Sequence, residues 1–333
     1  MRIVCDAHIP YLVEAVQKGW PEVEIYPMKS EEIDISALRD ADVLIVRTRT
    51  RVDANLLRGT KVQQVCTATI GYDHIDTAYC EAQGIQWMAC PGCNAQAVCD
   101  YIEEAIEEIQ NSKFKIQNSL TLGVVGVGHV GSLVAKMAER KGMRVLLNDP
   151  PKGIGVSLDE SEGIEPFMGG EIADCDIITF HVPLVRVQNT EYRIQTDFPT
   201  YHLCDEAFLA KCKPDALIIN ASRGGVVDEQ ALLRSGRKFI LDTWENEPHI
   251  CPEVLSHAFL ASMHIAGYSE EGKRNATQMC LDAVSAQWGL SPLKVPVAKA
   301  SGDSASGWLR RISERLKAAP EEFENLRRNY PLR

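Results

Sequence analysis

The sequence contains no long apolar run and no excess of positive charge. It has no stretch of roughly 18 consecutive apolar residues, so we expect no segment that spans a membrane. The formal net charge of its 333 residues is −11, and the absence of a long basic run argues against nucleic acid or an anionic membrane as a partner. Hydrophobic residues make up 45% and charged residues 24%, as in ordinary globular proteins. The length suggests about two or three domains.

The sequence also lacks the cysteine spacing of a disulfide-stabilised scaffold. Its 11 cysteines are an odd number scattered from Cys5 to Cys280, a usage that suits the reducing cytoplasm. One pair, Cys90 and Cys93, has the CxxC spacing that a redox dithiol or half of a zinc site would show. Because no second CxxC and no paired histidines supply further ligands, we favour a strand that ends at a Pro-Gly turn and expect no metal.

Apolar runs with strand and helix character alternate along the first ninety or so residues. This alternation predicts a parallel sheet covered by helices, in one small doubly wound α/β unit. Apolar side chains then recur at helical spacing over residues 94–113, which indicates a long linker helix. The expected strands are residues 2–5, 23–26, 41–46, 62–66 and 85–89, and the expected helices are residues 11–18, 33–39 and 76–83.

A glycine-rich turn follows the linker helix, between an apolar strand at residues 122–125 and an amphipathic helix at residues 132–140. Its glycines are Gly126, Gly128 and Gly131, in the pattern GxGxxG. The first permits a tight turn, the second lets the backbone approach a pyrophosphate, and the third lets the helix pack on the strand. The free N–H groups of the helix N-terminus favour the phosphates. The full strand–turn–helix context predicts a Rossmann-type dinucleotide-binding unit.

An acidic residue closes this unit at the end of its second strand. Asp149 follows the strand at residues 143–147, where a carboxylate accepts hydrogen bonds from a ribose diol. Its charge would repel a 2′-phosphate, which favours NAD over NADP, although Lys152 lies close by in the sequence.

Three residues with catalytic chemistry, Arg223, Glu247 and His264, come shortly after apolar stretches in the second half of the chain. Ligands of open parallel sheets bind beyond the carboxyl ends of the strands, so these side chains could meet there. An arginine can clamp a substrate carboxylate, and a histidine can take the proton of a hydroxyl while hydride leaves the same carbon. A glutamate can orient that histidine. Taken singly, each residue is more often structural than catalytic.

Whole motifs strengthen this interpretation. ASRGGVVDEQAL at Ala221, LDTWENEP at Leu241 and HIAGYSEEGK at His264 resemble the signature blocks of the D-isomer-specific 2-hydroxyacid dehydrogenases. A narrower resemblance, to members that oxidise 4-phospho-D-erythronate in vitamin B6 synthesis, rests on a second set of segments. These are VRTRTRV at Val46, ATIGYDHID at Ala68, PGCNAQAV at Pro91, LLNDPP at Leu146 and EFENLRRNY at Glu322.

The resemblance implies a role for individual residues. Arg223, Glu247 and His264 match the catalytic arginine, the catalytic glutamate and the proton-handling histidine of the family. The implied cofactor-binding residues are Gly126, Gly128, Gly131, Asp149, Val182, Asp242 and Gly267, and the implied substrate-binding residues are Thr48, Thr69 and Tyr268.

The resemblance also implies an architecture. We expect a Rossmann-type NAD domain at residues 94–264 and a smaller, discontinuous, flavodoxin-like substrate domain at residues 1–93 and 265–290. Residues 291–333 would form a shortened C-terminal association segment, so we expect a homodimer. The surface excursion at residues 184–202 is longer than the family leads us to expect.

The expected reaction is NAD-dependent oxidation of 4-phospho-D-erythronate to the corresponding 2-oxo acid, with a small phosphorylated 2-hydroxy acid as substrate. One alternative is a dehydrogenase for 3-phosphoglycerate or another D-2-hydroxy acid. Another is a non-catalytic protein that senses NAD. Arg47, Arg49 and Arg51 follow a predicted strand and could hold a terminal phosphate, although a solvated charged rim explains them equally well.

Overall fold

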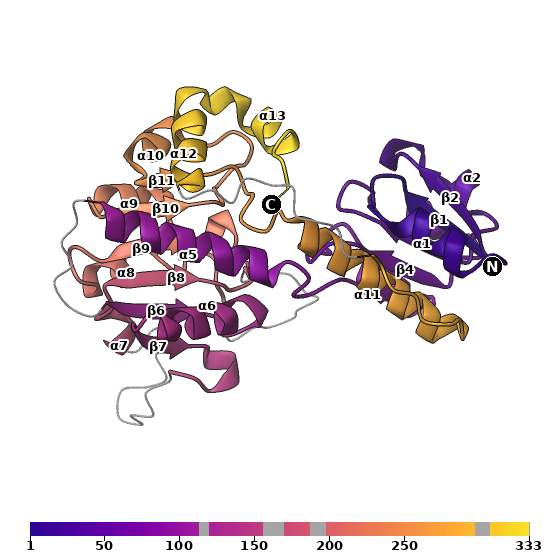
Figure 1. Cartoon of the computed structure of the whole chain (residues 1–333), viewed down its shortest axis with the longest axis horizontal. Helices are drawn as coiled ribbons and strands as arrows, with labels where there is room; N and C mark the ends of the chain where they lie inside the picture. Colours follow the sequence, from indigo (N-terminus) through magenta and orange to yellow (C-terminus); the bar gives the residue numbers. More distant parts are fainter. Residues whose placement is uncertain (113–119, 156–169, 187–197, 297–306, 333) are drawn as a thin grey trace. The chain divides into compact units, whose positions relative to one another are not determined.

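The computed structural model describes residues 1–112, 120–155, 170–186, 198–296 and 307–332 of the chain (Figure 1). These residues form two compact units. The first comprises residues 1–94, 268–302 and 332–333, and the second comprises residues 95–267 and 303–331. The junctions after residues 94 and 267 lie close to the expected boundaries, whereas the residues expected as a separate C-terminal segment are divided between the two units. The binding roles assigned to the domains stay predictions.

In the first unit, five strands of the described residues form a parallel sheet in the order β2-β1-β3-β4-β5. The strand order reverses between β1 and β3, a topology that brings the carboxyl ends of those strands to a ligand-binding edge. The strands are β1 (Arg2–Asp6), β2 (Glu24–Met28), β3 (Val43–Val46), β4 (Gln64–Thr67) and β5 (Gln86–Met88).

Both faces of this sheet are buried. Successive side chains of β1 point to opposite faces, so Ile3 and Cys5 belong to one hydrophobic cluster while Val4 belongs to the other. The long helix α11 packs on the sheet and contributes Cys280 and Leu281 to the first cluster (Figure 1). The helices of this unit are α1 (Leu12–Gly19), α2 (Ile35–Leu38), α3 (Ala54–Leu57), α4 (Thr77–Ala82) and α11 (Glu270–Trp288), with a 3₁₀ turn η1 (Ser30–Glu32).

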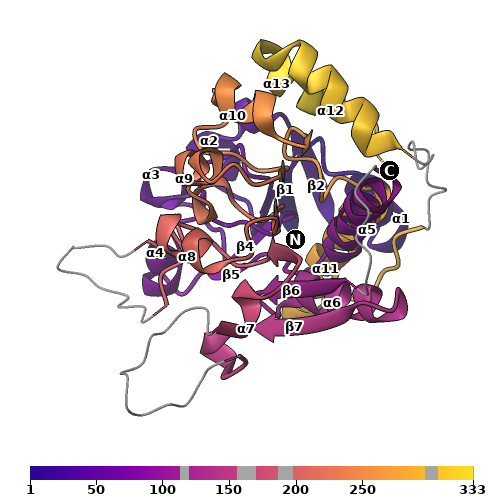
Figure 2. The same ribbon diagram turned by 90° about the vertical axis from the view of Figure 1, so that its left-hand side faces the viewer.

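The second unit contains a parallel sheet in which the described residues supply six strands, in the order β11-β10-β9-β8-β6-β7. Its order reverses between β6 and β8, as in Rossmann-like sheets. Figure 2 shows β6 and β7 with α6, which packs on both. The strands are β6 (Thr121–Val125), β7 (Arg144–Asn148), β8 (Ile177–Phe180), β9 (Leu217–Asn220), β10 (Phe239–Leu241) and β11 (Leu260–Ala261).

The C-terminal helices belong to the second unit. Helix α12 packs on β11 and α5 (Figure 1), and its residues Trp308, Leu309 and Leu316 are buried there. The helices of the unit are α5 (Ala95–Asn111), α6 (His129–Arg140), α7 (Gly170–Ala173), α8 (Glu206–Lys211), α9 (Glu229–Arg234), α10 (Pro252–His257), α12 (Trp308–Ala318) and α13 (Phe323–Arg328). The 3₁₀ turns are η2 (Pro150–Lys152), η3 (Gly224–Val226) and η4 (Pro320–Glu322).

The predicted α/β class with two parallel sheets is confirmed, whereas some element limits were wrong. The helix expected at residues 33–39 begins only at Ile35, because the Asp34 side chain accepts the N–H of Ala37 and caps the helix there. The sequence did not predict α3, since four residues show no helical period. Most of the surface excursion expected at residues 184–202 lies outside the described residues. No described helix is both long and apolar enough to cross a membrane.

Candidate active site

Three neighbouring strands of the second unit set the position of the candidate catalytic residues. Strands β9, β10 and β11 are parallel and adjacent, so their carboxyl ends share one edge of the sheet. Arg223 follows the end of β9, Glu247 follows β10, and His264 follows β11. The fold therefore brings these three residues, which are far apart in the sequence, to the same edge of the sheet.

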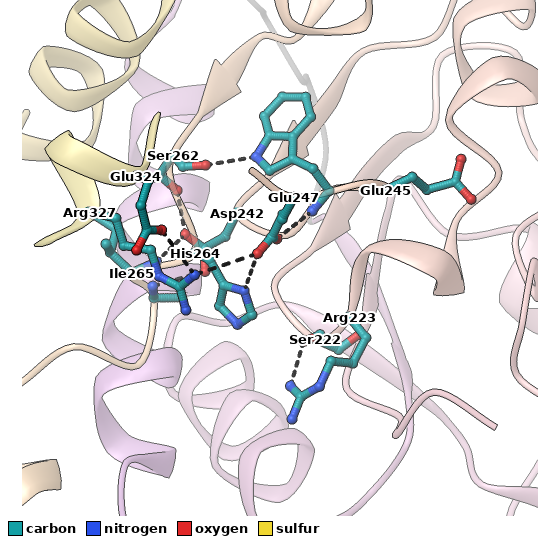
Figure 3. A network of polar contacts seen from close by, with 12 residues as sticks. Ser222, Arg223, Asp242, Glu245, Glu247, Ser262, His264, Ile265, Glu324 and Arg327 are labelled. Atoms are coloured by element: carbon teal, nitrogen blue, oxygen red, sulfur yellow. Dashed lines mark hydrogen bonds and ion pairs between the residues drawn. The ribbon is translucent and has the colours of Figure 1, made fainter. Parts of the chain in front are cut away.

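Glu247 and His264 form a close pair (Figure 3). Nδ1 of His264 lies 2.8 Å from Oε2 of Glu247, and the Trp244 N–H donates to Oε1 of the same carboxylate at 2.9 Å. Burial opposes ionisation of Glu247, but its contacts with His264, the Trp244 N–H and the charge of Arg327 outweigh this and hold its pKa below the ordinary value. An ionised carboxylate only accepts hydrogen bonds, so in the neutral imidazole Nδ1 carries the proton and Nε2 keeps its lone pair.

Asp242 holds the loop that carries His264. Its buried carboxylate accepts hydrogen bonds from the N–H groups of Ile265 (2.8 Å) and Ala266 (2.9 Å) and from the hydroxyl of Ser262 (2.6 Å). The His264 N–H donates to the Asp242 carbonyl at 2.7 Å. His264 has a left-handed φ of 57°, a conformation that costs a non-glycine residue about 1 kcal/mol or more. The hydrogen bonds of Asp242 sustain that conformation and fix the direction of the imidazole.

The loop that carries Arg223 packs against the loop that carries Glu247. A side chain at Gly224 would meet the Trp244 carbonyl oxygen at 1.9 Å, so only glycine allows this approach of the two backbones. The Arg223 guanidinium donates to the Ser222 carbonyl at 2.8 Å (Figure 3). Within the described part of the chain, no hydrogen bond or ion pair joins Arg223 to Glu247 or His264. Its remaining N–H groups suit an external carboxylate.

The glycine-rich turn has the shape that a dinucleotide requires. Gly126 has a φ of 92°, and a side chain there would collide with the backbone of His181 and with Val182 at 2.8 Å. A Cβ at Gly131 would lie 1.9 Å from the Gly126 carbonyl oxygen, so this glycine permits the contact of α6 with the strand. A Cβ at Gly128 would meet no described atom within 4 Å, which leaves the backbone open to a ligand. The turn therefore fits a pyrophosphate group.

Asp149 lies beside this turn at the end of β7. Its Oδ2 accepts the Val127 N–H at 2.9 Å and pairs with the Lys152 ammonium group at 3.3 Å. The Asp149 side chain is only 12% exposed, so these contacts hold one carboxylate oxygen in place. The arrangement leaves Oδ1 as the acceptor that could face a ribose hydroxyl.

The predicted substrate contacts belong to the first unit, whereas the candidate catalytic residues belong to the second unit. Thr48 follows β3 and is exposed, and Thr69 follows the neighbouring strand β4. The Thr69 hydroxyl hydrogen-bonds Thr67 at 2.7 Å and the Gly71 carbonyl at 3.0 Å. Tyr268 begins the returning segment of this unit, directly after Gly267, the last residue of the Ala95–Gly267 segment.

The three candidate phosphate-binding arginines differ in their contacts. Arg47 makes two hydrogen bonds to the buried Asp6, at 2.9 and 3.2 Å. Nε of Arg51 lies 3.6 Å from Oδ2 of Asp53. Arg49 has no hydrogen-bond or ion-pair partner among the residues that the structure describes. The structure thus ties Arg47 to the protein and leaves Arg49 available.

The CxxC pair lies in the core of the first unit. Cys90 Sγ donates to the carbonyl of Thr67 and lies 3.7 Å from Cys280 Sγ. Cys90 and Cys280 are fully buried. Burial raises the pKa of the Cys93 thiol to about 12, which disfavours the reactive thiolate. Nowhere in the described ranges do three His, Cys, Asp or Glu side chains form a group that could hold a metal ion.

Sequence reasoning missed several residues that support the site. Trp244 is buried and donates its indole N–H to the Ser262 carbonyl at 2.8 Å, which links the ends of β10 and β11. Glu229 is buried and accepts the Glu245 N–H at 2.6 Å. Arg327 reaches Glu247 from α13. All three residues lie inside the quoted motifs LDTWENEP, ASRGGVVDEQAL and EFENLRRNY, but no spacing in the sequence indicated the contacts that they make.

Sequence comparison identifies the family. The sequence model of the catalytic domain of the D-isomer specific 2-hydroxyacid dehydrogenases matches residues 3–294. The chain belongs to this family. Over its whole length it is 42% identical to a protein named erythronate-4-phosphate dehydrogenase from Bacteroides fragilis, of which it covers 97%. A protein of the same name from Porphyromonas gingivalis is 37% identical, with 99% of this chain and 92% of the relative covered.

Solved structures support the fold of this 2-hydroxyacid dehydrogenase. An NAD+-bound 3-phosphoglycerate dehydrogenase of Entamoeba histolytica is similar over 90% of this chain and 99% of its own, with a TM-score of 0.67 and 24% identity. The TT0316 protein of Thermus thermophilus gives a TM-score of 0.64 at 22% identity, with 89% of this chain and 100% of its own covered. At these identities the likeness is evidence for the fold alone.

Proposed function

We propose that this dehydrogenase oxidises 4-phospho-D-erythronate to 2-oxo-3-hydroxy-4-phosphobutanoate with NAD, in the synthesis of pyridoxine and pyridoxal 5′-phosphate. The observation that carries the reaction type is the pair of Glu247 and His264, 2.8 Å apart at the carboxyl ends of β10 and β11. The choice of substrate rests on the names of the relatives that match the whole chain.

The glycine-rich turn and Asp149 support NAD as the cofactor. Gly126, Gly128 and Gly131 leave room for a pyrophosphate, and the carboxylate of Asp149 is suited to a ribose diol rather than a 2′-phosphate. When bound, the nicotinamide supplies the hydride acceptor. Val182 lies against Gly126, where it would shape the cofactor site, whereas Asp242 and Gly267 would act through the backbone of the His264 loop.

The residues of this chain would handle the substrate's proton and charge. His264 takes the C2 hydroxyl proton on Nε2, while Glu247 holds Nδ1 and stabilises the imidazolium that forms. Arg223 clamps the substrate carboxylate through its remaining N–H groups. In the reverse direction His264 returns the proton. Thr48, Thr69 and Tyr268 are assigned as further substrate contacts.

The decisive experiment compares initial rates with 4-phosphoerythronate, 3-phosphoglycerate and D-lactate in the presence of NAD. Because the oxidation can be unfavourable at equilibrium, the corresponding 2-oxo acids with NADH are assayed in parallel. We expect a clear preference for the four-carbon phosphorylated pair. A preference for another pair would reassign the substrate and keep the mechanism. No turnover in either direction, with NAD still bound, would favour an NAD-sensing protein.

Arg49 is proposed to bind the terminal phosphate, because Arg47 is paired with Asp6 and Arg51 with Asp53. Arg49→Met should raise KM for the phosphorylated substrate about tenfold or more, since a charge-assisted hydrogen bond contributes roughly 1.5–3 kcal/mol. Arg51→Met removes the same charge two residues away and should change KM little. Equal KM values for wild type and Arg49→Met would contradict the assignment.

The same proposal places the enzyme in the cytoplasm as a homodimer. The apolar side chains of α12 pack within its own unit, so an association surface would use the outer face of the C-terminal helices. Light scattering of the full chain tests this, and a monomeric mass at micromolar concentration would exclude the dimer.

A further inference from the structure

Helix α13 brings a permanent cation, Arg327, to the pair of Glu247 and His264. Nη1 of Arg327 lies 3.9 Å from Oε2 of Glu247, the same oxygen that contacts Nδ1 of His264. Figure 3 shows the two groups reaching this carboxylate from different elements of the second unit. Glu247 therefore has one partner that can lose its proton and one that cannot.

The position of Arg327 is supported by packing. Phe323 is fully buried and Leu326 is nearly so, and together they anchor α13 to the second unit. Oε2 of Glu324 lies 3.8 Å from Nη1 of Arg327, one turn earlier in the helix. The Arg327 side chain is 29% exposed and the Glu247 side chain 18%, so solvent screens their interaction less than that of a fully exposed pair.

The carboxylate of Glu247 and the guanidinium of Arg327 have opposing effects on proton transfer. A carboxylate next to His264 favours the imidazolium, whereas a guanidinium at the same oxygen reduces that preference and repels the imidazolium directly. Arg327 also helps to hold the pKa of Glu247 below its ordinary value, after burial and the contacts with His264 and Trp244 are counted. The other charged groups near the pair are Glu229 on α9, Asp242 after β10 and Glu324 on α13. Arg223 donates to the Ser222 carbonyl, and Glu245 pairs with His202 and points away from Glu247 in Figure 3.

We propose that Arg327 is a positioning residue of the active site, which shares the Glu247 carboxylate with His264 and, by its charge, opposes the imidazolium that forms when His264 takes a proton. This inference rests on the proposed function of His264. It assigns a role in the chemistry to a helix at the far C-terminal end of the chain.

Arg327→Met tests the proposal through the pH dependence of kcat/KM for the oxidation. Loss of the guanidinium should move the acid limb of the profile to higher pH, by about 0.5 to 1 pH unit. Arg328→Met is the matched control, because Arg328 contacts Glu324 at 2.9 Å in the same helix and forms no hydrogen bond or ion pair with Glu247 among the described residues. We expect the control to leave the profile unchanged, and Arg327→Lys to restore most of the wild-type position.

Glu324→Gln supplies a test of opposite sign on a partly exposed residue, which is useful if Arg327→Met does not fold. Removing the acid that pairs with Arg327 should move the acid limb down, by about 0.2 to 0.3 pH unit. The proposal is overturned if folded Arg327→Met keeps the wild-type profile, if Arg328→Met shifts it equally, or if Glu324→Gln leaves it unmoved or moves it up.

Proton NMR separates this inference from the proposed reaction. The titration of the His264 ring, assigned with His264→Gln, is followed in the full chain without substrate. A protein that turns over no 2-hydroxy acid but shows the shift in Arg327→Met would overturn the reaction and support the effect of Arg327. An active protein whose His264 titration is the same in wild type and Arg327→Met would overturn this inference alone.

Discussion

Each unit holds a carboxylate paired with a basic side chain at the carboxyl ends of its parallel strands, and the two pairs differ in what they can do. Asp6 ends β1 and binds Arg47 after β3, whereas Glu247 follows β10 and binds His264 after β11. The side chain of Asp6 is fully buried, while that of His264 is 31% exposed. Arginine stays protonated at any working pH, but histidine can exchange its proton with a substrate.

The comparison shows that proximity at a strand end is not enough for catalysis. Burial raises the pKa of Asp6, but hydrogen bonds from Arg47, the His8 N–H and Ser30 more than compensate and lower it. The Arg47 guanidinium stays protonated, and the His8 N–H and the Ser30 hydroxyl are neutral donors, so these contacts connect the ends of two strands. The exposed imidazole of His8 also lies near Asp6, with Nδ1 at 3.3 Å from Oδ1. The pair of Glu247 and His264 uses the same geometry with a partner that titrates.

Replacing the titratable partner should have the largest effect. His264→Gln keeps a polar side chain at this position and removes the proton acceptor, so kcat should fall about 10³-fold. NAD binding, measured by fluorescence titration, should stay close to that of the wild type. Turnover within a factor of ten of the wild type would show that another group takes the proton.

Breaking the permanent pair should cost stability instead. Arg47→Met leaves the buried carboxylate of Asp6 without its cation and should lower the free energy of unfolding by about 3 kcal/mol at pH 7. Arg49→Met removes the same charge from a side chain without a described partner and should change it by less than about 0.5 kcal/mol. Urea denaturation of both variants measures the difference, and equal midpoints would contradict the assigned role of Asp6.

Neutralising the carboxylate of the catalytic pair should have an intermediate effect. Glu247→Gln keeps the shape and one acceptor but removes the charge that stabilises the imidazolium, so kcat should fall about 10²-fold. The reverse reaction with NADH should fall similarly, because it needs the protonated form of His264. A variant with full activity in both directions would remove Glu247 from the mechanism.

The smallest expected effect concerns Glu229, behind the pair. Burial raises the pKa of Glu229 to about 7 from an ordinary value of 4.5, and the nearby acids Glu245, Glu247 and Asp228 add to the shift. Because the folded state then binds this proton more tightly than the unfolded state, stability falls as the pH rises from 4.5 to 7. Glu229→Gln should reduce this fall in the free energy of unfolding by about 2 kcal/mol. Parallel wild-type and variant curves from chemical denaturation would contradict this.

The sequence predicted those parts of the fold that depend on local patterns. The glycines at 126, 128 and 131 indicated a turn whose observed geometry matches their expected roles, because steric limits on the backbone act within a few residues. Buried strands such as β3 were visible as continuous apolar runs. Helix α3 was not, because four residues are too few to show a period.

The candidate site was only partly predictable. The motifs indicated Arg223, Glu247 and His264, but their spacing could not show that Asp242 would use both carboxylate oxygens to hold the His264 loop. The hydrogen bonds of Asp242 depend on a left-handed backbone conformation at His264, which no local pattern encodes.

The sequence by itself determined the α/β class, the glycine-rich turn and the types of residue that could carry out the chemistry, since each follows from side-chain size, polarity and short-range periodicity. Only the tertiary structure decided which charges meet. Glu247 and His264 are 17 positions apart, and Arg327 lies 63 positions beyond His264, yet both His264 and Arg327 reach the carboxylate of Glu247. Electrostatic energy depends on distance and burial, and both quantities exist only once the chain has folded.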